Sequence, residues 1–452
     1  MLSIIIASNC SSGGKTTFTL ALIKALVNRG YKVQGYKVGP DYIDTAFHTY
    51  ISKRASRNLD AFLMGEEGVK EAYTKGNGDI GIIEGVMGLY DGLGLDTKYS
   101  TYHISKILKL PIILLVTPKA QSNTLCAELL GILNYKDADI IGVVLNNINK
   151  EYYVILKRLI EKNTNLTVFG FIPKDDKIAL ESRHLGLIQS CETNQLDYKI
   201  ERASKLLEEN VDLTRLISYF KNTEVKSGIS YNRPNKKLKI AYALDKAFNF
   251  YYKDNLELFQ SIGELVPFSP LNDKKLPQDI DFLYIGGGYP EVFEKKLASN
   301  KALLSDIKNK LEQGLPAYAE CGGLMYLTKG SKSAELVGFF DGKYKFTDKL
   351  INFGYATTEV NKSNNIFKKG LKINCHEFHK SYVSLNEEKM FKLTKDNYGD
   401  AKEWECGYIK KNVVAGYAHV HFYANMEFFD SLINLVAEYK ESLKWTDYKK
   451  DM

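Results

Sequence analysis

The segment SIIIASNCSSGGKTT, residues 3–17, decides the fold of the N-terminal half of the chain. Its first part is a continuous apolar and β-branched run, which is typical of a strand buried on both faces. A glycine-containing turn follows, and Lys15 then opens a helical pattern that Gly30 is suited to end. One face of this helix carries Phe18, Leu22, Ala25, Leu26 and Arg29. The segment therefore predicts a strand, a tight turn and a helix in direct succession.

Similar apolar runs recur along the first half, at residues 112–116, 140–145 and 167–172, with helical patterns between them. Strands that alternate with helices predict a parallel sheet with helices on both faces. The pattern lapses in the polar segment 221–237 and then restarts with the runs LKIAYAL, GELVPF, DFLYIGGG and LPAYAEC. We therefore predict an α/β protein with two domains, residues 1–222 and 238–452, joined by a linker at 223–237.

The composition is that of an ordinary soluble globular protein, since 44% of the 452 residues are hydrophobic and 25% are charged. The net charge of +7 comes from interleaved Lys and Glu, without the long basic run that nucleic-acid binding would favour. No apolar run reaches membrane-spanning length, and the N-terminus lacks the features of a signal peptide. The six cysteines, at positions 10, 126, 191, 321, 375 and 406, show no CxxC pairing, which favours a reducing, cytoplasmic setting.

The first turn has the residues of a phosphate-binding loop of the P-loop type. Backbone N–H groups and a helix N-terminus face the anion, Lys15 reaches the outer phosphates, and the hydroxyl of Thr16 holds Mg²⁺. The match to GxxxxGK[ST] is imperfect, because Asn9 stands where the first glycine belongs. We expect a nucleotide to bind at Gly13, Gly14, Lys15, Thr16 and Thr17. The alternative is a Ser/Gly turn that merely precedes a lysine.

A Mg²⁺ ion beside phosphates also needs a carboxylate, typically from the end of a neighbouring strand. The segment DIGIIEGVMGLYDG, residues 79–92, ends an apolar run with Glu84 and then breaks into glycines. The segment YKVGPDYIDTAFH, residues 36–48, ends another run and offers Asp41 and Asp44. Ligands sit at the carboxyl ends of parallel strands, so these acids are candidates, although an exposed acidic turn would look similar.

A second strand-turn-helix pattern surrounds Cys321, where LPAYAE runs into the cysteine and then into GGLMYL. Such an elbow exposes a nucleophile and places it at a helix N-terminus, which favours the thiolate over the thiol. The alternative is a buried cysteine that packs as a small hydrophobic side chain, as we expect for most of the other cysteines.

A nucleophilic cysteine needs a base, and four of the seven histidines lie after residue 370. His419 and His421, in GYAHVHF, follow a strand-like run where a base can meet the thiol. His376 and His379 are spaced one residue short of HExxH and have no further ligands nearby, which disfavours a zinc site. The glycines of 285–288 end another strand and are candidates for N–H groups that stabilise an oxyanion.

Taken together, these motifs resemble the cobyrinate a,c-diamide synthase family over nearly the whole chain. The resemblance to the family's glutamine amidotransferase domain rests on ECGGLMYL, GGGYPEVF, HEFHKS and GYAHVHF. The resemblance to its ATP-binding domain, which is itself similar to dethiobiotin synthetase, rests on SSGGKTT, KVGPDYID and EGVMGLYDG. The resemblance implies that residues 1–222 bind ATP and Mg²⁺ and that residues 238–452 form an α/β glutamine amidotransferase domain.

The resemblance also implies residue roles. Cys321 would be the glutaminase nucleophile and His419 its base, with His421 as the second candidate. Many related glutaminases have a glutamate two residues after the histidine, and here that position is His421, so a Cys–His dyad is expected instead of a triad. Metal ligands would be Thr16, Asp41 and Glu84, and substrate contacts would come from Asp41, Tyr42, Asp44, Gly287 and Gly288.

The reaction implied by the family is ATP- and glutamine-dependent amidation of the a and c carboxylates of cobyrinic acid. The same chemistry on nickel-sirohydrochlorin is the nearest alternative, because both substrates are acidic, flat and similarly decorated. The other two alternatives are a non-catalytic P-loop ATPase that senses or partitions a target and a free-standing glutaminase. The sequence leaves the oligomeric state open, with a homodimer as one option.

Overall fold

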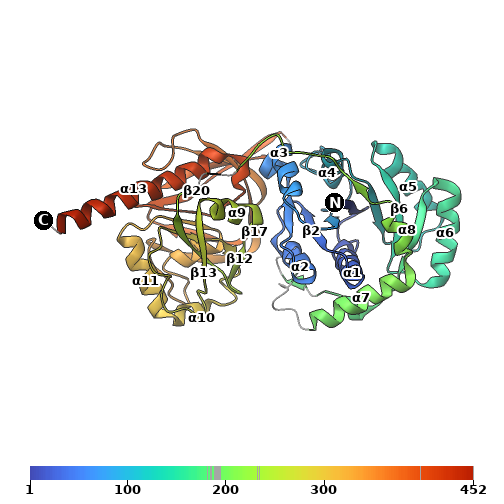
Figure 1. Ribbon diagram of the computed structural model, residues 1–452, viewed down its shortest axis with the longest axis horizontal. Coiled ribbons are helices and arrows are strands. Elements are labelled where there is room, and N and C mark those ends of the chain that lie inside the picture. The colour runs from blue at the N-terminus through green and yellow to red at the C-terminus, as the bar shows by residue number, and fades with distance from the viewer. Residues whose placement is uncertain are drawn as a thin grey trace. The chain divides into compact units, whose positions relative to one another are not determined.

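The computed structural model shown in Figure 1 describes residues 1–180, 182–183, 186–187, 195–231, 233, 235–397 and 399–450. Cys191 and two positions of the expected linker, Asn232 and Pro234, lie outside the described residues. The chain forms two compact units, one of Met1–Ala61 with Gly65–Ser230 and the other of Phe62–Met64 with Tyr231–Met452. Among the described residues, no helix combines the length and the apolar character that crossing a membrane requires.

The first unit is built on a parallel sheet with strand order β3-β2-β4-β1-β5-β6-β7. The bounds are β1 Leu2–Ser8, β2 Val33–Val38, β3 Arg57–Leu59, β4 Ile80–Glu84, β5 Ile112–Val116, β6 Ile140–Asn146 and β7 Thr167–Ile172. A short strand, β10 (Lys221–Asn222), pairs antiparallel with β1. The predicted strands at 3–8, 112–116, 140–145 and 167–172 are therefore confirmed, and β1 lies in the middle of the sheet because its side chains are buried on both faces.

Helices cover both faces of this sheet, as Figure 1 shows. On one face lie α1 (Lys15–Asn28), α2 (Tyr42–Ser52) and α7 (Leu196–Asn210). On the other lie α4 (Thr101–Leu108), α5 (Asn123–Tyr135) and α6 (Lys150–Thr164). The remaining elements are α3 (Ala61–Thr74), kinked at Gly65, α8 (Leu213–Ile217), η1 (Asp176–Ile178), β8 (Ser182–Arg183) and β9 (Gly186–Leu187). The carboxyl ends of β1, β2 and β4 meet at one edge of the sheet, which is where the candidate acids lie.

The second unit contains a mixed sheet with strand order β13-β11-β14-β16-β21-β20-β19-β17-β18-β22. Its parallel half consists of β11 Leu238–Ala243, β13 Gly263–Phe268, β14 Phe282–Ile285, β16 Ala317–Glu320 and β21 Val413–Gly416. Its antiparallel half consists of β17 Gly342–Val360, β18 Lys372–Leu385, β19 Lys389–Asn397, β20 Asp400–Lys410 and β22 His419–Val420. The segment 330–400, which shows little periodicity in the sequence, thus forms long strands.

Short and long helices complete the second unit. They are α9 (Lys253–Ile262), α10 (Glu294–Ser299), α11 (Lys301–Glu312), α12 (Gly322–Leu327), α13 (Met426–Lys450) and the single-turn η2 (Phe422–Ala424). A separate ribbon joins β12 (Phe248–Phe250) to β15 (Gly287–Gly288). The predicted strands at LKIAYAL, GELVPF, DFLYI and PAYAE are all present, so the second domain is α/β as expected.

The core of the second unit is aromatic. Phe259 of α9 is fully buried, and its ring contacts those of Phe282, Tyr284 and Phe422 at centroid distances of 5.6, 5.3 and 5.7 Å. These rings come from the helix, from the central strand β14 and from the segment that follows the histidines. Phe259 therefore ties the histidine segment to the sheet.

We predict that Phe259→Ala lowers the free energy of unfolding of the second unit by about 3–5 kcal/mol, because it leaves a cavity among these rings. Phe346→Ala is the matched control, since Phe346 is 52% exposed and its loss should cost less than about 0.5 kcal/mol. Urea unfolding followed by circular dichroism measures both. Equal effects of the two substitutions would contradict the packing described here.

Candidate active sites

The phosphate-binding turn joins β1 to α1 as predicted, and its geometry explains why glycine is needed there. Gly14 caps α1 with a φ of 84°, in the left-handed region that favours glycine. A Cβ atom at this position would lie 2.4 Å from Nδ2 of Asn146. The same Asn146 nitrogen donates hydrogen bonds to the carbonyl of Gly13, at 3.3 Å, and to the Thr117 hydroxyl, at 3.1 Å. The turn is thus held by the ends of β5 and β6.

Lys15 lies inside this turn. Its ammonium group donates to the Ser8 hydroxyl at 2.8 Å and to the carbonyls of Cys10, at 3.2 Å, and Met87, at 2.5 Å. Burial and the nearby ammonium of Lys37 lower the pKa of Lys15 to about 8. Thr16 and Thr17, in the first turn of α1, are half-buried. The lysine is therefore surrounded by neutral oxygens, and an anionic phosphate is a stronger partner for it.

Glu84, the last residue of β4, is fully buried and accepts three polar contacts. Its Oε1 accepts from the Thr16 hydroxyl at 2.6 Å and from the Lys37 ammonium at 2.9 Å, and its Oε2 lies 2.8 Å from Nε2 of His48. Burial alone would raise the pKa of Glu84, but Lys37, His48 and Thr16 hold it well below its ordinary value. Glu84 is therefore an anion at neutral pH, positioned beside the turn.

The acids of the KVGPDYID segment take two different positions. Asp44 forms an ion pair with Lys37 at 2.6 Å, and burial, Asp41 and Glu84 raise its pKa. Asp41 caps α2, because its carboxylate accepts the backbone N–H groups of Ile43 and Asp44 at 2.8 and 2.9 Å. Tyr42 is the first residue of α2. The structure thus brings Asp44, but not the capping oxygen of Asp41, directly into the cluster around Glu84.

Sequence reasoning missed Lys37 and His48, which complete this cluster. Lys37 is the penultimate residue of β2 and lies two residues before the GPDYID loop, so its place near a strand end was a usable signal. His48 is fully buried in α2, and its fit depends on Gly35, where a Cβ atom would lie 2.8 Å from Cβ of the histidine. That contact joins residues of two different elements, and nothing in the spacing of the sequence indicates it.

The donors beside the turn suit magnesium better than zinc. In the part of the chain that the structure describes, no group of three or more His, Cys, Asp or Glu side chains is arranged to hold a metal by itself. Mg²⁺ usually takes one or two carboxylates, with phosphate oxygens and water as the other ligands. The Thr16 hydroxyl and the Glu84 carboxylate, 2.6 Å apart at the phosphate turn, fit that pattern.

The second site is centred on Cys321, between β16 and α12. Its backbone adopts φ 50° and ψ −103°, a strained conformation for a non-glycine residue, and its N–H donates to the Gly416 carbonyl at 2.8 Å. The next two residues have no room for side chains. A Cβ at Gly322 would lie 2.9 Å from Cδ of Pro290, and one at Gly323 would lie 2.2 Å from the Ile285 carbonyl. The predicted elbow is therefore present.

The expectation that the elbow favours a thiolate is wrong for the structure as it stands. The cysteine is 7% exposed, and burial, followed by the carboxylate of Glu291, raises the pKa of the Cys321 thiol well above its ordinary value. The short helix α12 does not offset this cost. The thiol is therefore protonated at neutral pH, and its activation requires a base.

His419 is the candidate for such a base. It is in β22, paired in register with His376 of β18, and it is 2% exposed. Gly287 packs against its ring, because a Cβ there would lie 2.5 Å from Cε1 of the histidine. The N–H nitrogen of Gly288 lies 3.3 Å from the Cβ position of Gly322. The structure thus brings Gly287 and Gly288 between the His419 ring and the start of the cysteine's helix.

The other candidate histidines face different partners. Nδ1 of His421 accepts from the Tyr423 N–H at 3.3 Å, and its Nε2 lies 3.9 Å from the Asp254 carboxylate in α9. Nε2 of His379 lies 3.0 Å from the Glu377 carboxylate. The Gly286 N–H donates to the Tyr251 hydroxyl at 2.9 Å, so that member of the glycine run is already engaged. These positions leave His419 as the stronger candidate for the base.

The described cysteines Cys10, Cys126, Cys321, Cys375 and Cys406 are free thiols. Cys126, Cys375 and Cys406 are buried, as expected for packing residues, and Cys10 is exposed in the phosphate turn. Among these, Cys321 is the one that lies at a strained strand-to-helix elbow.

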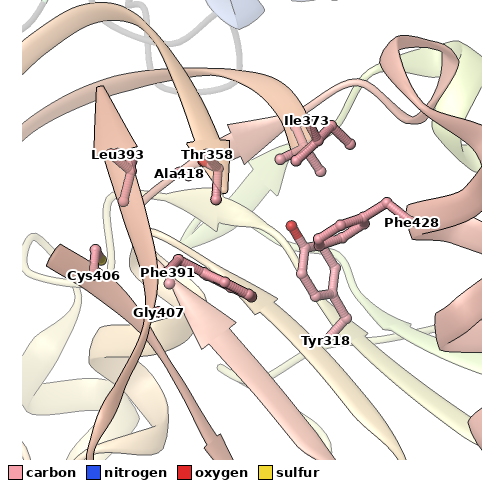
Figure 2. A pocket seen from close by; sticks show the side chains of 11 residues that line it. Tyr318, Thr358, Ile373, Phe391, Leu393, Cys406, Gly407, Ala418 and Phe428 are labelled. Carbon is pink, nitrogen blue, oxygen red and sulfur yellow. The ribbon is translucent and has the colours of Figure 1, made fainter. Parts of the chain in front are cut away.

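A small cavity lies within the second unit (Figure 2). Its walls come from β16–β22 and α13 and are mainly apolar, apart from Tyr318 and Thr358. The lining residues are Tyr318, Thr358, Ile373, Phe391, Leu393, Cys406, Gly407, Gly416, Ala418, Val420 and Phe428. A lining of this kind does not suit an amino acid with two charged groups, so we do not assign glutamine to it.

Fold and sites define the class of protein: a nucleotide-binding unit joined to a glutamine amidotransferase unit. Residues 4–188 match the family model described as "CobQ/CobB/MinD/ParA nucleotide binding domain", and residues 239–427 match "CobB/CobQ-like glutamine amidotransferase domain".

Curated relatives specify the family within this class. The chain is 58% identical over 438 residues to the cobyrinate a,c-diamide synthase of Clostridium acetobutylicum, which covers 96% of this chain and 100% of the relative. The enzymes of the same name from Clostridium tetani and Caldanaerobacter subterraneus are 56% and 42% identical, covering 96% and 94% of this chain and 100% and 96% of the relatives. The chain belongs to the cobyrinate a,c-diamide synthase family.

We predict that Gly14→Ala weakens ATP binding at least about tenfold, a loss of about 1.4 kcal/mol, because the new methyl group displaces Asn146 from the turn. Gly30→Ala is the matched control, since Gly30 has a similar φ of 88° but nothing within 4 Å of its Cβ position. Both substitutions place alanine at a left-handed backbone position, so they should lower the free energy of unfolding by similar amounts. Titration calorimetry with ATP separates them, and equal affinities would contradict the role of the turn.

We also predict that His419 makes the second unit sensitive to acid. Burial, together with the nearby His376 and His379, lowers the pKa of His419 from 6.5 to about 3. Between these values the unfolded chain binds a proton that the folded protein does not. The free energy of unfolding therefore falls as pH decreases below 6.5, by up to about 1.4 kcal/mol per pH unit. Denaturant unfolding at several pH values measures this dependence. As pH falls, the free energy of unfolding should decrease less in His419→Gln than in the wild type, and equal decreases in the two proteins would contradict the prediction.

Proposed function

We propose that this protein amidates the a and c carboxylates of cobyrinic acid, using ATP and ammonia that it releases from glutamine. The observation that carries this proposal is the presence, in one chain, of a phosphate turn with a buried anionic glutamate and of a strained cysteine elbow in a unit that also carries the buried His419. The relatives named cobyrinate a,c-diamide synthase match the chain over both sites. This name favours cobyrinic acid over nickel-sirohydrochlorin, and the amidotransferase unit disfavours a P-loop sensor.

In the proposed glutaminase reaction, His419 takes the proton of the Cys321 thiol, and the sulfur attacks the side-chain amide carbon of glutamine. The low pKa of His419 keeps its imidazole unprotonated at neutral pH. Backbone N–H groups of Gly287 and Gly288 are candidates for stabilising the oxyanion. The proton then passes to the departing ammonia, leaving a thioester on Cys321 that water hydrolyses to glutamate and free thiol.

In the proposed synthetase reaction, the turn and Lys15 hold the phosphates of ATP while the γ-phosphoryl group passes to a substrate carboxylate. Ammonia attacks the resulting acyl phosphate, and inorganic phosphate leaves as the amide forms. Thr16 and Glu84 would hold Mg²⁺, which supplies positive charge to the phosphates when bound. Lys37 of β2 lies against Glu84 of β4 and Asp44 of α2, so it keeps both carboxylates in place.

Other parts of the assignment rest on the resemblance. Asp41, Tyr42 and Asp44 remain predicted substrate contacts, with Asp41 also a predicted metal ligand. We assign the synthetase reaction to residues 1–222, the glutaminase reaction to residues 238–452 and the linker to 223–237. We place the enzyme in the cytoplasm, where its thiol stays reduced, and a homodimer remains a prediction.

We predict that Cys321→Ser abolishes amidation with glutamine but retains amidation with ammonium chloride within about threefold of the wild type, because only ammonia supply depends on the thiol. Cys406→Ser is the matched control, since Cys406 is also a buried thiol but faces the cavity of Figure 2. Product mass spectrometry with each nitrogen source measures this. Glutamine-dependent activity in Cys321→Ser would contradict the proposal.

A further inference from the structure

Glu320, the last residue of β16, directly precedes Cys321 and is 1% exposed. Its Oε1 accepts from the Tyr318 hydroxyl at 3.0 Å and from the Val420 backbone N–H at 3.1 Å. Its Oε2 accepts from the Tyr284 hydroxyl at 3.1 Å. A buried carboxylate in this position needs such donors, and here one of them is a main-chain group of another strand.

Val420 is the residue between His419 and His421. Asn255 of α9 holds the same segment on its other side, donating to the Val420 carbonyl at 2.8 Å and accepting from the Phe422 N–H at 2.9 Å. Asn255 is fully buried. The backbone around His419 is therefore held by two buried polar side chains in addition to its short pairing with β18.

Apolar packing alone does not fix this segment. Val420 and Tyr318 both line the cavity of Figure 2, so the space beside them is not filled by side chains. A strand of two residues can shift toward such a space unless polar contacts hold it. The hydrogen bond from Val420 to Glu320 joins the histidine segment directly to the residue before the nucleophile.

The residue two positions after His419 does not supply a carboxylate that could hold the histidine segment in the same way. It is occupied by His421, whose ring faces Tyr423 and Asp254. The carboxylate that lies next to the cysteine in the chain and touches the histidine segment is Glu320.

We propose that Glu320 is a positioning residue of the glutaminase reaction, holding the Val420 N–H so that His419 stays in place for Cys321. Tyr284 and Tyr318, whose rings stack at 5.8 Å, fix the orientation of the carboxylate. Asn255 restrains the opposite edge of the segment. This inference rests on the proposed roles of Cys321 and His419 and adds a residue that acts through the backbone of the histidine segment.

The test compares Glu320→Met, which keeps the length of the side chain but has only a weakly accepting thioether, with Glu320→Gln, whose amide oxygen can still accept from Val420. We expect Glu320→Met to lower kcat for glutamine hydrolysis about 100-fold, the effect of a displacement near 1 Å, with KM for glutamine within about threefold. Ammonia-dependent amidation should be unchanged. Glu320→Gln should hydrolyse glutamine at least about tenfold faster than Glu320→Met.

The proposal is overturned if Glu320→Met hydrolyses glutamine within about threefold of the wild type, or if Glu320→Gln is no better than Glu320→Met. It is also overturned if glutamine- and ammonia-dependent rates fall together in a folded variant. Should Glu320→Met not fold, the double variant Tyr284→Phe/Tyr318→Phe decides the question, because it keeps the carboxylate but removes both hydroxyls that fix it. A loss of about tenfold in glutamine hydrolysis supports the proposal, and an unchanged rate overturns it. A wild-type enzyme without glutaminase activity would instead contradict the proposed function.

Discussion

Both candidate sites depend on one steric constraint: a buried parallel strand must enter a helix through a turn that leaves no room for side chains. At the phosphate turn, the amide of Asn146 occupies the space where a Cβ of Gly14 would lie. At the cysteine elbow, the Ile285 carbonyl occupies the space beside Gly323. These close approaches place a helix N-terminus and a reactive side chain at the carboxyl edge of each sheet. The chemistry proposed for each unit follows from that placement.

The second physical requirement is that each buried charge has partners. Glu84 is buried completely, yet Lys37, His48 and Thr16 hold its pKa below the ordinary value, so it remains an anion next to the phosphate turn. Glu320 is buried almost as deeply but has only neutral donors, and burial raises its pKa to about 7. Each of the two glutamates is the last residue of a parallel strand. Their different partners suit one to a cation and the other to a structural hydrogen-bond network.

Much of this arrangement was predictable from the sequence, because strands buried on both faces are continuous apolar runs and tight turns require glycine. The strands on either side of Gly14 and Cys321, the two α/β units and the candidate acid Glu84 all follow from those local rules. The segment 330–400 was not predictable in this way, since its long strands mix buried and exposed positions instead of forming continuous apolar runs. Lys37, His48 and Glu320 were missed for a different reason. Their roles depend on contacts between strands and helices that are far apart in the chain.

The expected reactivity of Cys321 shows where local reasoning fails. A helix N-terminus lowers a thiol pKa, but α12 has only six residues, and the protein around the sulfur removes it from water. Burial therefore outweighs the helix, and the structure requires a base to activate the thiol. His419, whose imidazole is kept neutral by its own burial, is the candidate for that base.

The central claim is that one chain converts glutamine nitrogen and ATP into amides on a tetrapyrrole. The most direct measurement is to incubate the purified protein with Mg-ATP, cobyrinic acid and glutamine labelled with ¹⁵N in its side-chain amide, and to analyse the product by mass spectrometry. We expect a product that carries two labelled amides, at the a and c positions, with no product when ATP is omitted. Unmodified cobyrinic acid, or amidation of nickel-sirohydrochlorin alone in a parallel reaction, would contradict it.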